Sequence, residues 1–281
     1  MSVLTIEDAR SSASALEAFY GRSDAEVLAD PDFGRHHERL LSGLESGELR
    51  AARLEDDGEW RASAWIKRAL LLGFRGLPTV PVEGWGAPFF DRGAYLPRRF
   101  EAADGVRLVP GGSAVRRGAH VAPGVVIMPP AYVNVGAFVG EGTMVDSHAL
   151  VGSCAQIGAG VHLSAGAQIG GVLEPPGSLP VVVEDGAFIG GQCGVFEGLV
   201  VGARAVLAPG VQLTAATEIF DLARGEVLRG RVPEGAVVVP GTRPARGELA
   251  LRLSLALYAP VIVKYRDPGT DAATALEGAL R

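Results

Sequence analysis

Asp146 is the residue whose type and position most clearly suggest chemistry. It lies in the segment GTMVDSHAL, directly after Val145, at a point of a repeating pattern where most other repeats carry glycine, alanine or another small residue. Departures from a local pattern tend to be functional. A positioned carboxylate can act as a general base, taking a proton from an attacking nitrogen. The alternative is that Asp146 only stabilises its own turn by bonding the backbone.

Histidines and cysteines in the same region are further candidates. His148 lies two residues from Asp146, so it could orient a substrate, and the alternative is a histidine that only stabilises its turn. A zinc site needs several ligands brought together, and the spacings of 28 and 14 residues between His120, His148 and His162 match no local ligand pair. We therefore expect no metal site. The two cysteines, Cys154 and Cys193, are expected to pack as small apolar groups.

A ladder of aliphatic residues at every sixth position must place these side chains. It runs without a break from Val109 to Ile169. The segment EPPGSLP, which we expect to be a loop, then interrupts the six-residue period. A six-residue period is typical of a parallel β-helix. Each ladder residue is expected to point into a triangular coil of short strands and tight turns. After the interruption the ladder continues through Val183, Ile189, Val195, Val201, Leu207, Leu213 and Ile219, and then through Val232 and Val238.

The chain is expected to have three parts, of which the middle one contains this ladder. Residues 1–103 are predicted to form a mostly helical N-terminal domain and connector, with a hairpin turn at Asp57-Gly58. Residues 104–242 are predicted to form the β-helix. Residues 243–281 are predicted to form an extension, with a strand in SLALYAPVIVKY and a final helix in DAATALEGALR that caps the exposed end.

Composition limits the kinds of partner. A net charge of −6 argues against a general nucleic-acid or membrane-surface binder, which would need a basic face. The N-terminus lacks the basic start and apolar run of a signal peptide, and no apolar run reaches the roughly 20 residues needed to cross a bilayer. Two cysteines make no disulfide framework and fit a reducing compartment. We expect a cytoplasmic protein that acts on small molecules.

Several long segments resemble the tetrahydrodipicolinate N-succinyltransferase family. They are AYVNVGAFVGEGTMVDSHALVGSCAQIGAGVHLSAGAQIGGVLEP, VEDGAFIGG and YAPVIVKY, and GELRAARLEDDGEWRASAWIKRALLLGFR is similar to the family's N-terminal domain. The resemblance implies a mainly β fold: a left-handed parallel β-helix of hexapeptide repeats with a smaller N-terminal α/β domain and a short strand-helix extension. It also implies a homotrimer with active sites between subunits. The implied reaction moves succinyl from succinyl-CoA, as cosubstrate, to the nitrogen of tetrahydrodipicolinate, with no bound cofactor or metal.

The resemblance also implies the catalytic carboxylates. Asp146 occupies the position of the family's catalytic aspartate. The family commonly has a glutamate where this chain has Gly194, so the usual second acid is absent. Glu197, three residues on, matches another acidic position of the family and is the candidate replacement, with a solvated turn residue as the alternative. Glu174 and Glu184 are further carboxylates that a neighbouring subunit could supply.

The resemblance points to two cationic contacts as well. Arg107 matches an arginine that contacts the dicarboxylate substrate, and a guanidinium suits a carboxylate because it donates two parallel hydrogen bonds. Lys264, one of only two lysines, matches a lysine of the family's C-terminal strand and could contact a coenzyme A phosphate. Packing at a strand end is the alternative for Lys264, and a surface arginine at the start of the β-helix is the alternative for Arg107.

Three other functions stay open at this point. An acetyl-CoA-dependent N-acyltransferase of the same fold would use similar residues, and the sequence does not locate the extra contact that a succinyl group needs. A zinc-dependent β-helix enzyme would need three histidines at an interface. A structural or binding role is disfavoured by the N-terminal domain and by Asp146.

Overall fold

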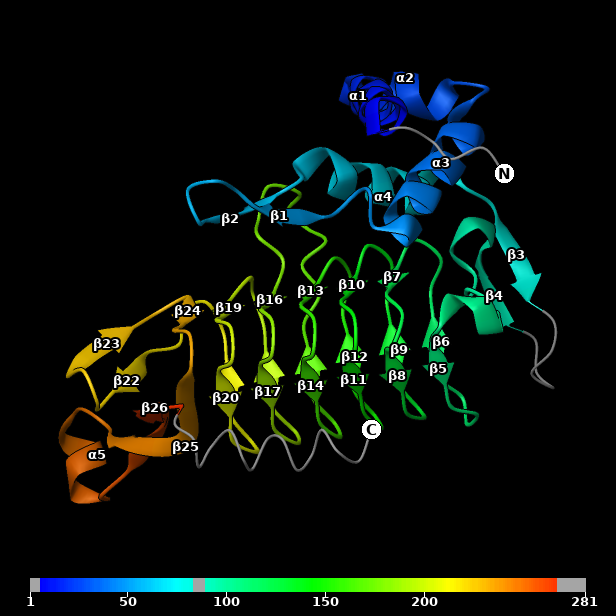
Figure 1. The fold of residues 1–281 in the computed structure, drawn as a ribbon. Helices are drawn as coiled ribbons and strands as arrows, with labels where there is room; N and C mark the ends of the chain where they lie inside the picture. Colours follow the sequence, from blue (N-terminus) through cyan, green and yellow to red (C-terminus); the bar gives the residue numbers. More distant parts are fainter. Residues whose placement is uncertain (1–5, 83–88, 267–281) are drawn as a thin grey trace.

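The structure is a computed structural model that describes residues 6–82 and 89–266 of the 281-residue chain. A helical N-terminal domain lies along one side of a long β-helix, and a hairpin arm extends its far end (Figure 1). No helix within the described ranges is long and apolar enough to cross a membrane.

The N-terminal domain combines four helices with a small hairpin. Tyr20, Leu40, Leu41 and Leu70 are fully buried at its centre. The predicted turn at Asp57-Gly58 is confirmed, because Leu54 pairs with Trp60 across it. The elements are α1 (Ile6–Gly21), α2 (Asp24–Ala29), α3 (Phe33–Ser46), β1 (Ala52–Leu54), β2 (Trp60–Ala62) and α4 (Ala64–Gly76), followed by the antiparallel pair β3 (Thr79–Val82) and β4 (Phe89–Arg92) and the 3-10 turns η1 (Gly93–Tyr95) and η2 (Ala102–Asp104).

The β-helix consists of two-residue strands stacked in three parallel sheets. Sheet one contains β7 (His120–Val121), β10 (Phe138–Val139), β13 (Gln156–Ile157), β16 (Val182–Val183), β19 (Val200–Val201) and β24 (Arg231–Val232). Sheet two contains β5 (Arg107–Leu108), β8 (Val126–Ile127), β11 (Met144–Val145), β14 (His162–Leu163), β17 (Phe188–Ile189) and β20 (Val206–Leu207). Sheet three contains β6 (Ala114–Val115), β9 (Tyr132–Val133), β12 (Leu150–Val151), β15 (Gln168–Ile169), β18 (Gly194–Val195) and β21 (Gln212–Leu213).

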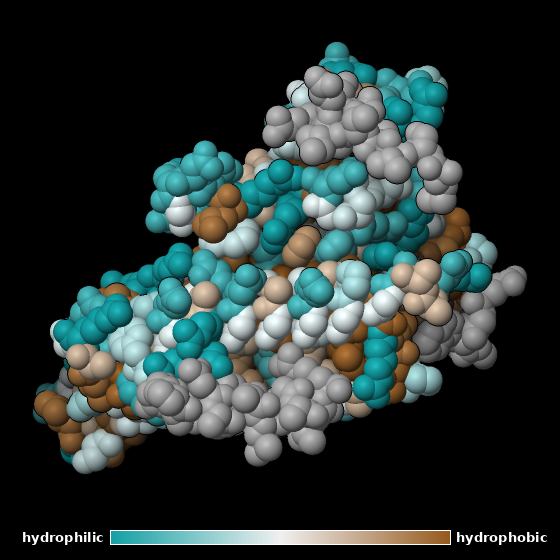
Figure 2. Space-filling model, viewed as in Figure 1, coloured by the Kyte–Doolittle hydropathy of each residue, from teal (hydrophilic) through white to brown (hydrophobic). Residues whose placement is uncertain are grey.

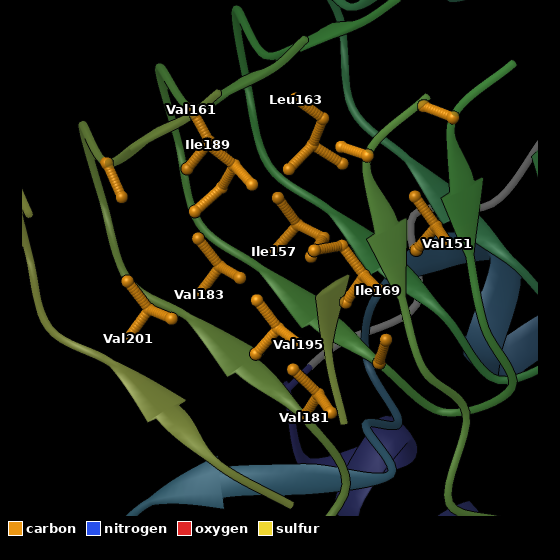
Figure 3. Close-up of a cluster of buried hydrophobic side chains, with 14 of the residues drawn as sticks. Val151, Ile157, Val161, Leu163, Ile169, Val181, Val183, Ile189, Val195 and Val201 are labelled. Carbon is orange, nitrogen blue, oxygen red and sulfur yellow. The ribbon is translucent and has the colours of Figure 1, made fainter. Parts of the chain in front are cut away.

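The aliphatic ladder forms the core of this β-helix, as the period predicts. One coil is 18 residues long, so that Val121 pairs with Val139 and Val139 with Ile157. Figure 3 shows the ladder side chains of successive coils, such as Val183 and Val201, pointing into the interior. Every ladder residue from Val115 onward is at most 5% exposed. The architecture is the left-handed parallel β-helix of hexapeptide-repeat proteins.

The predicted first member of the ladder is wrong. Leu108, not Val109, pairs with Ile127 and packs against the core, and Val109 is only half-buried. Seven residues instead of six separate Leu108 from Val115, because the Gly111-Gly112 turn contains one extra residue. Both glycines have positive φ, 142° and 97°, which most other residues reach only with strain.

The predicted interruption of the ladder is a loop, residues 170–181, and it reaches the N-terminal domain. Ile157 pairs with Val183, 26 residues on instead of 18, so the loop adds eight residues to one coil. The Lys67 ammonium of α4 donates hydrogen bonds to the carbonyl oxygens of Pro175 (3.1 Å) and Ser178 (2.6 Å). The loop is thus attached to a helix more than 100 residues earlier in the chain.

A hairpin arm follows the last coil. β25 (Ala236–Pro244) pairs with β20 and, through the turn that contains α5 (Glu248–Arg252), with β26 (Ala256–Tyr265). β26 confirms the strand predicted in SLALYAPVIVKY, and β26 also pairs with the hairpin of β22 (Ile219–Asp221) and β23 (Glu226–Leu228). The helix predicted in DAATALEGALR lies outside the described residues.

Candidate active site

Asp146 lies at the corner between sheets two and three, in the turn that joins β11 to β12. Its N–H donates to the Leu163 carbonyl of the next coil at 2.9 Å, and its Oδ1 accepts the N–H of Ser147 at 2.7 Å. Asp146 therefore does stabilise its own turn. The other carboxylate oxygen, Oδ2, accepts no hydrogen bond from the described residues, and the side chain is half-buried. One oxygen orients the group and the other is available to a proton.

His148 belongs to the same turn. Its φ of +63° is a left-handed conformation, which glycines adopt at the equivalent places Gly142 and Gly166. The His148 side chain is exposed, and the His148 carbonyl accepts a hydrogen bond from Gln168 Nε2 at 3.0 Å. The structure thus places an imidazole beside Asp146 on the outer surface of the corner.

Arg107 lies on the outward face of sheet two, near the same corner. It pairs with Val126, which pairs with Met144, two residues before Asp146. Two strand spacings, roughly 10 Å in all, separate the Arg107 and Met144 backbones. Arg107 is exposed. Of the predicted residues, Arg107, Asp146 and His148 are the three that a single chain brings to one region.

Glu197 lies elsewhere, at the corner between sheets three and one. It follows β18, two coils beyond Asp146, and it is exposed with φ +59°. The next residue, Gly198, packs so closely on the 170–181 loop that an added Cβ would lie 2.4 Å from the Leu179 carbonyl oxygen. Within one chain, sheet three separates Glu197 from Asp146.

At Gly194, where the family resemblance leads one to expect a glutamate, two neighbouring side chains occupy the place that a Cβ would take. It lies on sheet three between Gln168 and Gln212 of the neighbouring coils. A Cβ added at Gly194 would lie 2.2 Å from Gln212 Oε1 and 2.5 Å from Phe196 Cε2. The space next to the backbone is therefore filled by an amide and an aromatic ring.

The remaining candidate carboxylates and Lys264 also lie away from Asp146. Glu184 accepts hydrogen bonds from Trp60 Nε1 (2.9 Å) and Ala203 N–H (3.0 Å) and pairs with Arg231, at the corner between sheets one and two. Glu174 is exposed on the 170–181 loop. Lys264 is exposed on β26, which β14, β17, β20 and β25 separate from β11.

The thiols and the other histidines are structural. Cys154 and Cys193 are fully buried, and burial raises the pKa of the Cys154 thiol to about 12, so it is a poor nucleophile at neutral pH. His120 stacks on Phe138 in sheet one, whereas His162 packs against Phe188 in sheet two. No group of three or more His, Cys, Asp or Glu side chains in the described part of the chain is placed to hold a metal ion.

One further arrangement of polar residues has no signal in the sequence. Arg50, in the N-terminal domain, donates through Nε to Gln156 Oε1 of sheet one at 3.0 Å, across 106 positions of sequence. Neither residue belongs to a local motif. Only the packing of the domain against the β-helix brings them together.

The fold and the corner carboxylate place the chain in the hexapeptide-repeat β-helix class. The family model described as Tetrahydrodipicolinate N-succinyltransferase N-terminal matches residues 16–75. Relatives named 2,3,4,5-tetrahydropyridine-2,6-dicarboxylate N-succinyltransferase match much more of the chain. The one from Acinetobacter baylyi is 44% identical over 94% of this chain and 96% of its own length, and the one from Polynucleobacter asymbioticus is 47% identical over 86% and 87%. The chain belongs to the tetrahydrodipicolinate N-succinyltransferase family.

Proposed function

We propose that this protein transfers a succinyl group from succinyl-CoA to the nitrogen of tetrahydrodipicolinate, giving N-succinyl-2-amino-6-ketopimelate in the succinylase route to diaminopimelate and lysine. The observation that carries the proposal is the similarity, over 94% of the chain, to relatives that bear this name. The position of Asp146 supports it, because a corner carboxylate with one unbonded oxygen suits proton transfer.

In the proposed mechanism Asp146 is the general base. Water first adds across the C=N bond of the ring, so that the ring nitrogen carries a hydrogen and a free electron pair. Asp146 Oδ2 takes this proton as the nitrogen attacks. The nitrogen attacks the thioester carbonyl, the C–N bond forms, and the C–S bond breaks to release coenzyme A. Asp146 returns its proton to the departing thiolate. The ring C–N bond of the hydrate then breaks, its hydroxyl proton passes to the amide nitrogen, and the ketone forms. The hydrogen bond from Ser147 N–H keeps the carboxylate oriented throughout.

Arg107 and His148 are proposed to bind the substrate. Tetrahydrodipicolinate carries two carboxylates, and Arg107 can hold one of them through two parallel hydrogen bonds. Arg107 lies on the face of sheet two that leads to the Asp146 corner. Both side chains are exposed in one chain, so a ligand or a second chain can cover them.

A homotrimer is proposed to complete the site. The arm formed by β25, α5 and β26 exposes a group of large apolar side chains, a surface that usually marks a protein interface. Glu197 and Lys264 are proposed to reach the Asp146 region of a neighbouring subunit, as second acid and as contact for a coenzyme A phosphate. The exposed apolar residues are Leu249, Leu251, Leu253, Leu255, Leu257, Tyr258 and Val263. We also propose that the enzyme works in the cytoplasm.

A donor comparison tests the proposed function. Release of the coenzyme A thiol is followed with succinyl-CoA and with acetyl-CoA, each with and without tetrahydrodipicolinate. We expect thiol release only when the acceptor is present, with a higher kcat/KM for succinyl-CoA. Equal or greater kcat/KM with acetyl-CoA would identify an acetyltransferase instead, and no acceptor-dependent release with either donor would support a structural role.

A further inference from the structure

A groove of about 890 Å³ runs between the N-terminal domain and the β-helix, away from the Asp146 corner. Its outer wall is the β1–β2 hairpin, which stands over the β-helix in Figure 1 and forms a projecting lobe in Figure 2. Its floor is the corner between sheets one and two, which Gly140, Gly158 and Ala159 line. The β-helix thus carries a second concave surface at another of its three corners.

Arg50 is the main polar group of this groove. Its guanidinium lies over the Phe138 ring, 3.7 Å from the ring centroid, and its Nε donates to the neutral amide of Gln156. The terminal guanidinium nitrogens donate to none of the described residues, and Arg50 forms no ion pair with any of them. Burial lowers the pKa of Arg50 to about 10, so it remains a cation at neutral pH.

Arg50 has no direct ion pair within the described part of the chain, although the charge of the nearby Asp185 carboxylate favours its cationic form. A partly buried cation without a directly bonded anion is costly, and a ligand anion that bonds it would reduce that cost. The stacking on Phe138 and the bond to Gln156 fix the plane of the guanidinium, so its forked end is preorganised for two parallel hydrogen bonds to a carboxylate or a phosphate. Gln156 is itself fully buried and donates to the Cys154 carbonyl at 2.9 Å, which holds its oxygen towards Arg50.

Other side chains along the groove would also contact a ligand bound to Arg50. Arg53 adds a second positive charge on the hairpin side, and Glu141 and Asp185 are exposed on the β-helix side. Glu184 is occupied by Trp60, Ala203 and Arg231. Trp60 and Leu54 offer apolar surface beside Arg50, whose guanidinium lies 5.6 Å from the Trp60 ring.

We propose that this groove is a second small-molecule site, which binds a compound that carries a carboxylate or phosphate on a flat apolar body. The anionic group pairs with Arg50, and the apolar body lies against Trp60 and Leu54. The site is separate from the proposed catalytic corner, because Asp146 lies at the corner between sheets two and three, whereas the groove lies at the corner between sheets one and two. Its occupancy does not depend on the proposed reaction.

Titration of the full-length protein with benzoate, phenyl phosphate and benzamide tests the site. Binding is followed by calorimetry and by tryptophan fluorescence, with Trp60→Phe identifying the reporter. We expect one benzoate or phenyl phosphate per chain and at least about 10-fold weaker binding of the uncharged benzamide, the loss expected without a charge-assisted hydrogen bond. The stronger of the two anions identifies the group that the site prefers.

Matched variants show whether the anions bind in this groove. Arg50→Gln should weaken anion binding at least about 10-fold, and Ala159→Phe, at an exposed floor position, should obstruct the groove without disturbing the core. Arg35→Gln, an exposed arginine of α3, and Asp146→Asn should leave binding unchanged. Absence of binding by both anions, or wild-type binding by both Arg50→Gln and Ala159→Phe, would overturn the proposal. Loss of binding in Asp146→Asn would place the anions in the catalytic corner instead.

Discussion

Asp146 and Glu197 lie on opposite sides of sheet three: Asp146 precedes β12, and Glu197 follows β18, two coils further along. A single chain therefore does not place the two carboxylates at one reaction centre. A general base and a general acid must both be within hydrogen-bond reach of the reacting atoms. Either Glu197 serves a site built with the Asp146 of another subunit, or it takes no part in the chemistry.

A Glu197→Gln variant distinguishes these two cases. If Glu197 of one subunit completes the site of the next, Glu197→Gln should lower kcat by about 10²-fold, the usual contribution of general acid catalysis. Co-expression of Glu197→Gln with Asp146→Asn should then restore part of the activity, because some sites in mixed oligomers combine the two intact residues. An unchanged kcat in Glu197→Gln would remove it as the second acid.

Asp146→Asn tests the general base. The amide keeps the size of the side chain and its oxygen can still accept the Ser147 N–H, so the turn should survive. We expect kcat to fall by about 10²-fold or more, with an unchanged melting temperature and oligomeric state. Asp56→Asn, an exposed acid of the β1–β2 turn, is the matched control. Near-normal turnover in Asp146→Asn would refute the assignment.

Gly194→Glu tests whether the site can accept the missing carboxylate. Because the added Cβ would contact Gln212 and Phe196, we expect the melting temperature to fall, with a loss of about 1–3 kcal/mol in the free energy of unfolding. The double variant Gly194→Glu/Phe196→Val should recover part of this loss, since it removes the ring. Gly177→Glu, where an added Cβ meets nothing within 4 Å, should cost little. Equal melting temperatures for Gly194→Glu and wild type would show that the side chains move aside freely.

The β-helix was predictable because its rule is local. One inward aliphatic residue every six positions determines which side chain is buried, and this holds from Val115 to Val238 apart from the interruptions between Ile169 and Val183 and between Ile219 and Val232. The error at Val109 arose where the Gly111-Gly112 turn adds one residue, which a fixed period does not detect. The position of Glu197 relative to Asp146 also depended on the length of the 170–181 insertion, because each residue's corner follows from its place within an 18-residue coil.

The groove and the role of Lys67 were not predictable in the same way. Arg50 and Gln156 meet only because a helical domain packs on the β-helix, and no periodicity connects residues 106 positions apart. Asp146 could be singled out from sequence because it departs from a repeat. Arg50 departs from none, so only its tertiary contacts with Phe138 and Gln156 single it out.

His37 should make the stability of the N-terminal domain depend on pH. It is fully buried, and burial lowers its pKa from 6.5 to about 4. The unfolded chain therefore binds more protons than the folded one between these values, so stability is fully present above about pH 6.5 and is lost as the pH falls towards 4. The shift corresponds to about 3 kcal/mol.

Urea unfolding of wild type and His37→Asn at several pH values checks this. Wild type should lose stability between pH 6.5 and 4, and His37→Asn should lose about 3 kcal/mol less over that interval. Ser42→Asn, at an exposed position of α3 without a titrating group, should keep the wild-type slope. Identical slopes for His37→Asn and wild type would assign the pH dependence to other groups.

Lys67 should control the accessibility of the 170–181 loop. Its side chain is fully buried, and its ammonium donates to two carbonyl oxygens, those of Pro175 and Ser178. Lys67→Met keeps the length of the side chain but removes both donors, and the loss of a hydrogen bond from a charged group costs about 1.5–3 kcal/mol. We expect the loop to detach, so that proteases cleave within 170–181 several times faster than in wild type.

Lys67→Arg is the conservative comparison for Lys67→Met. Lys67→Arg keeps the charge and N–H donors but is bulkier, so it should protect the loop better than Lys67→Met. The Leu179 carbonyl of the loop also packs against Gly198, the residue after Glu197. Detachment of the loop should therefore change the surroundings of Glu197. If Glu197 acts in catalysis, Lys67→Met should therefore lower kcat as well as increase cleavage. Wild-type cleavage rates in Lys67→Met would show that the Leu179 contact alone holds the loop.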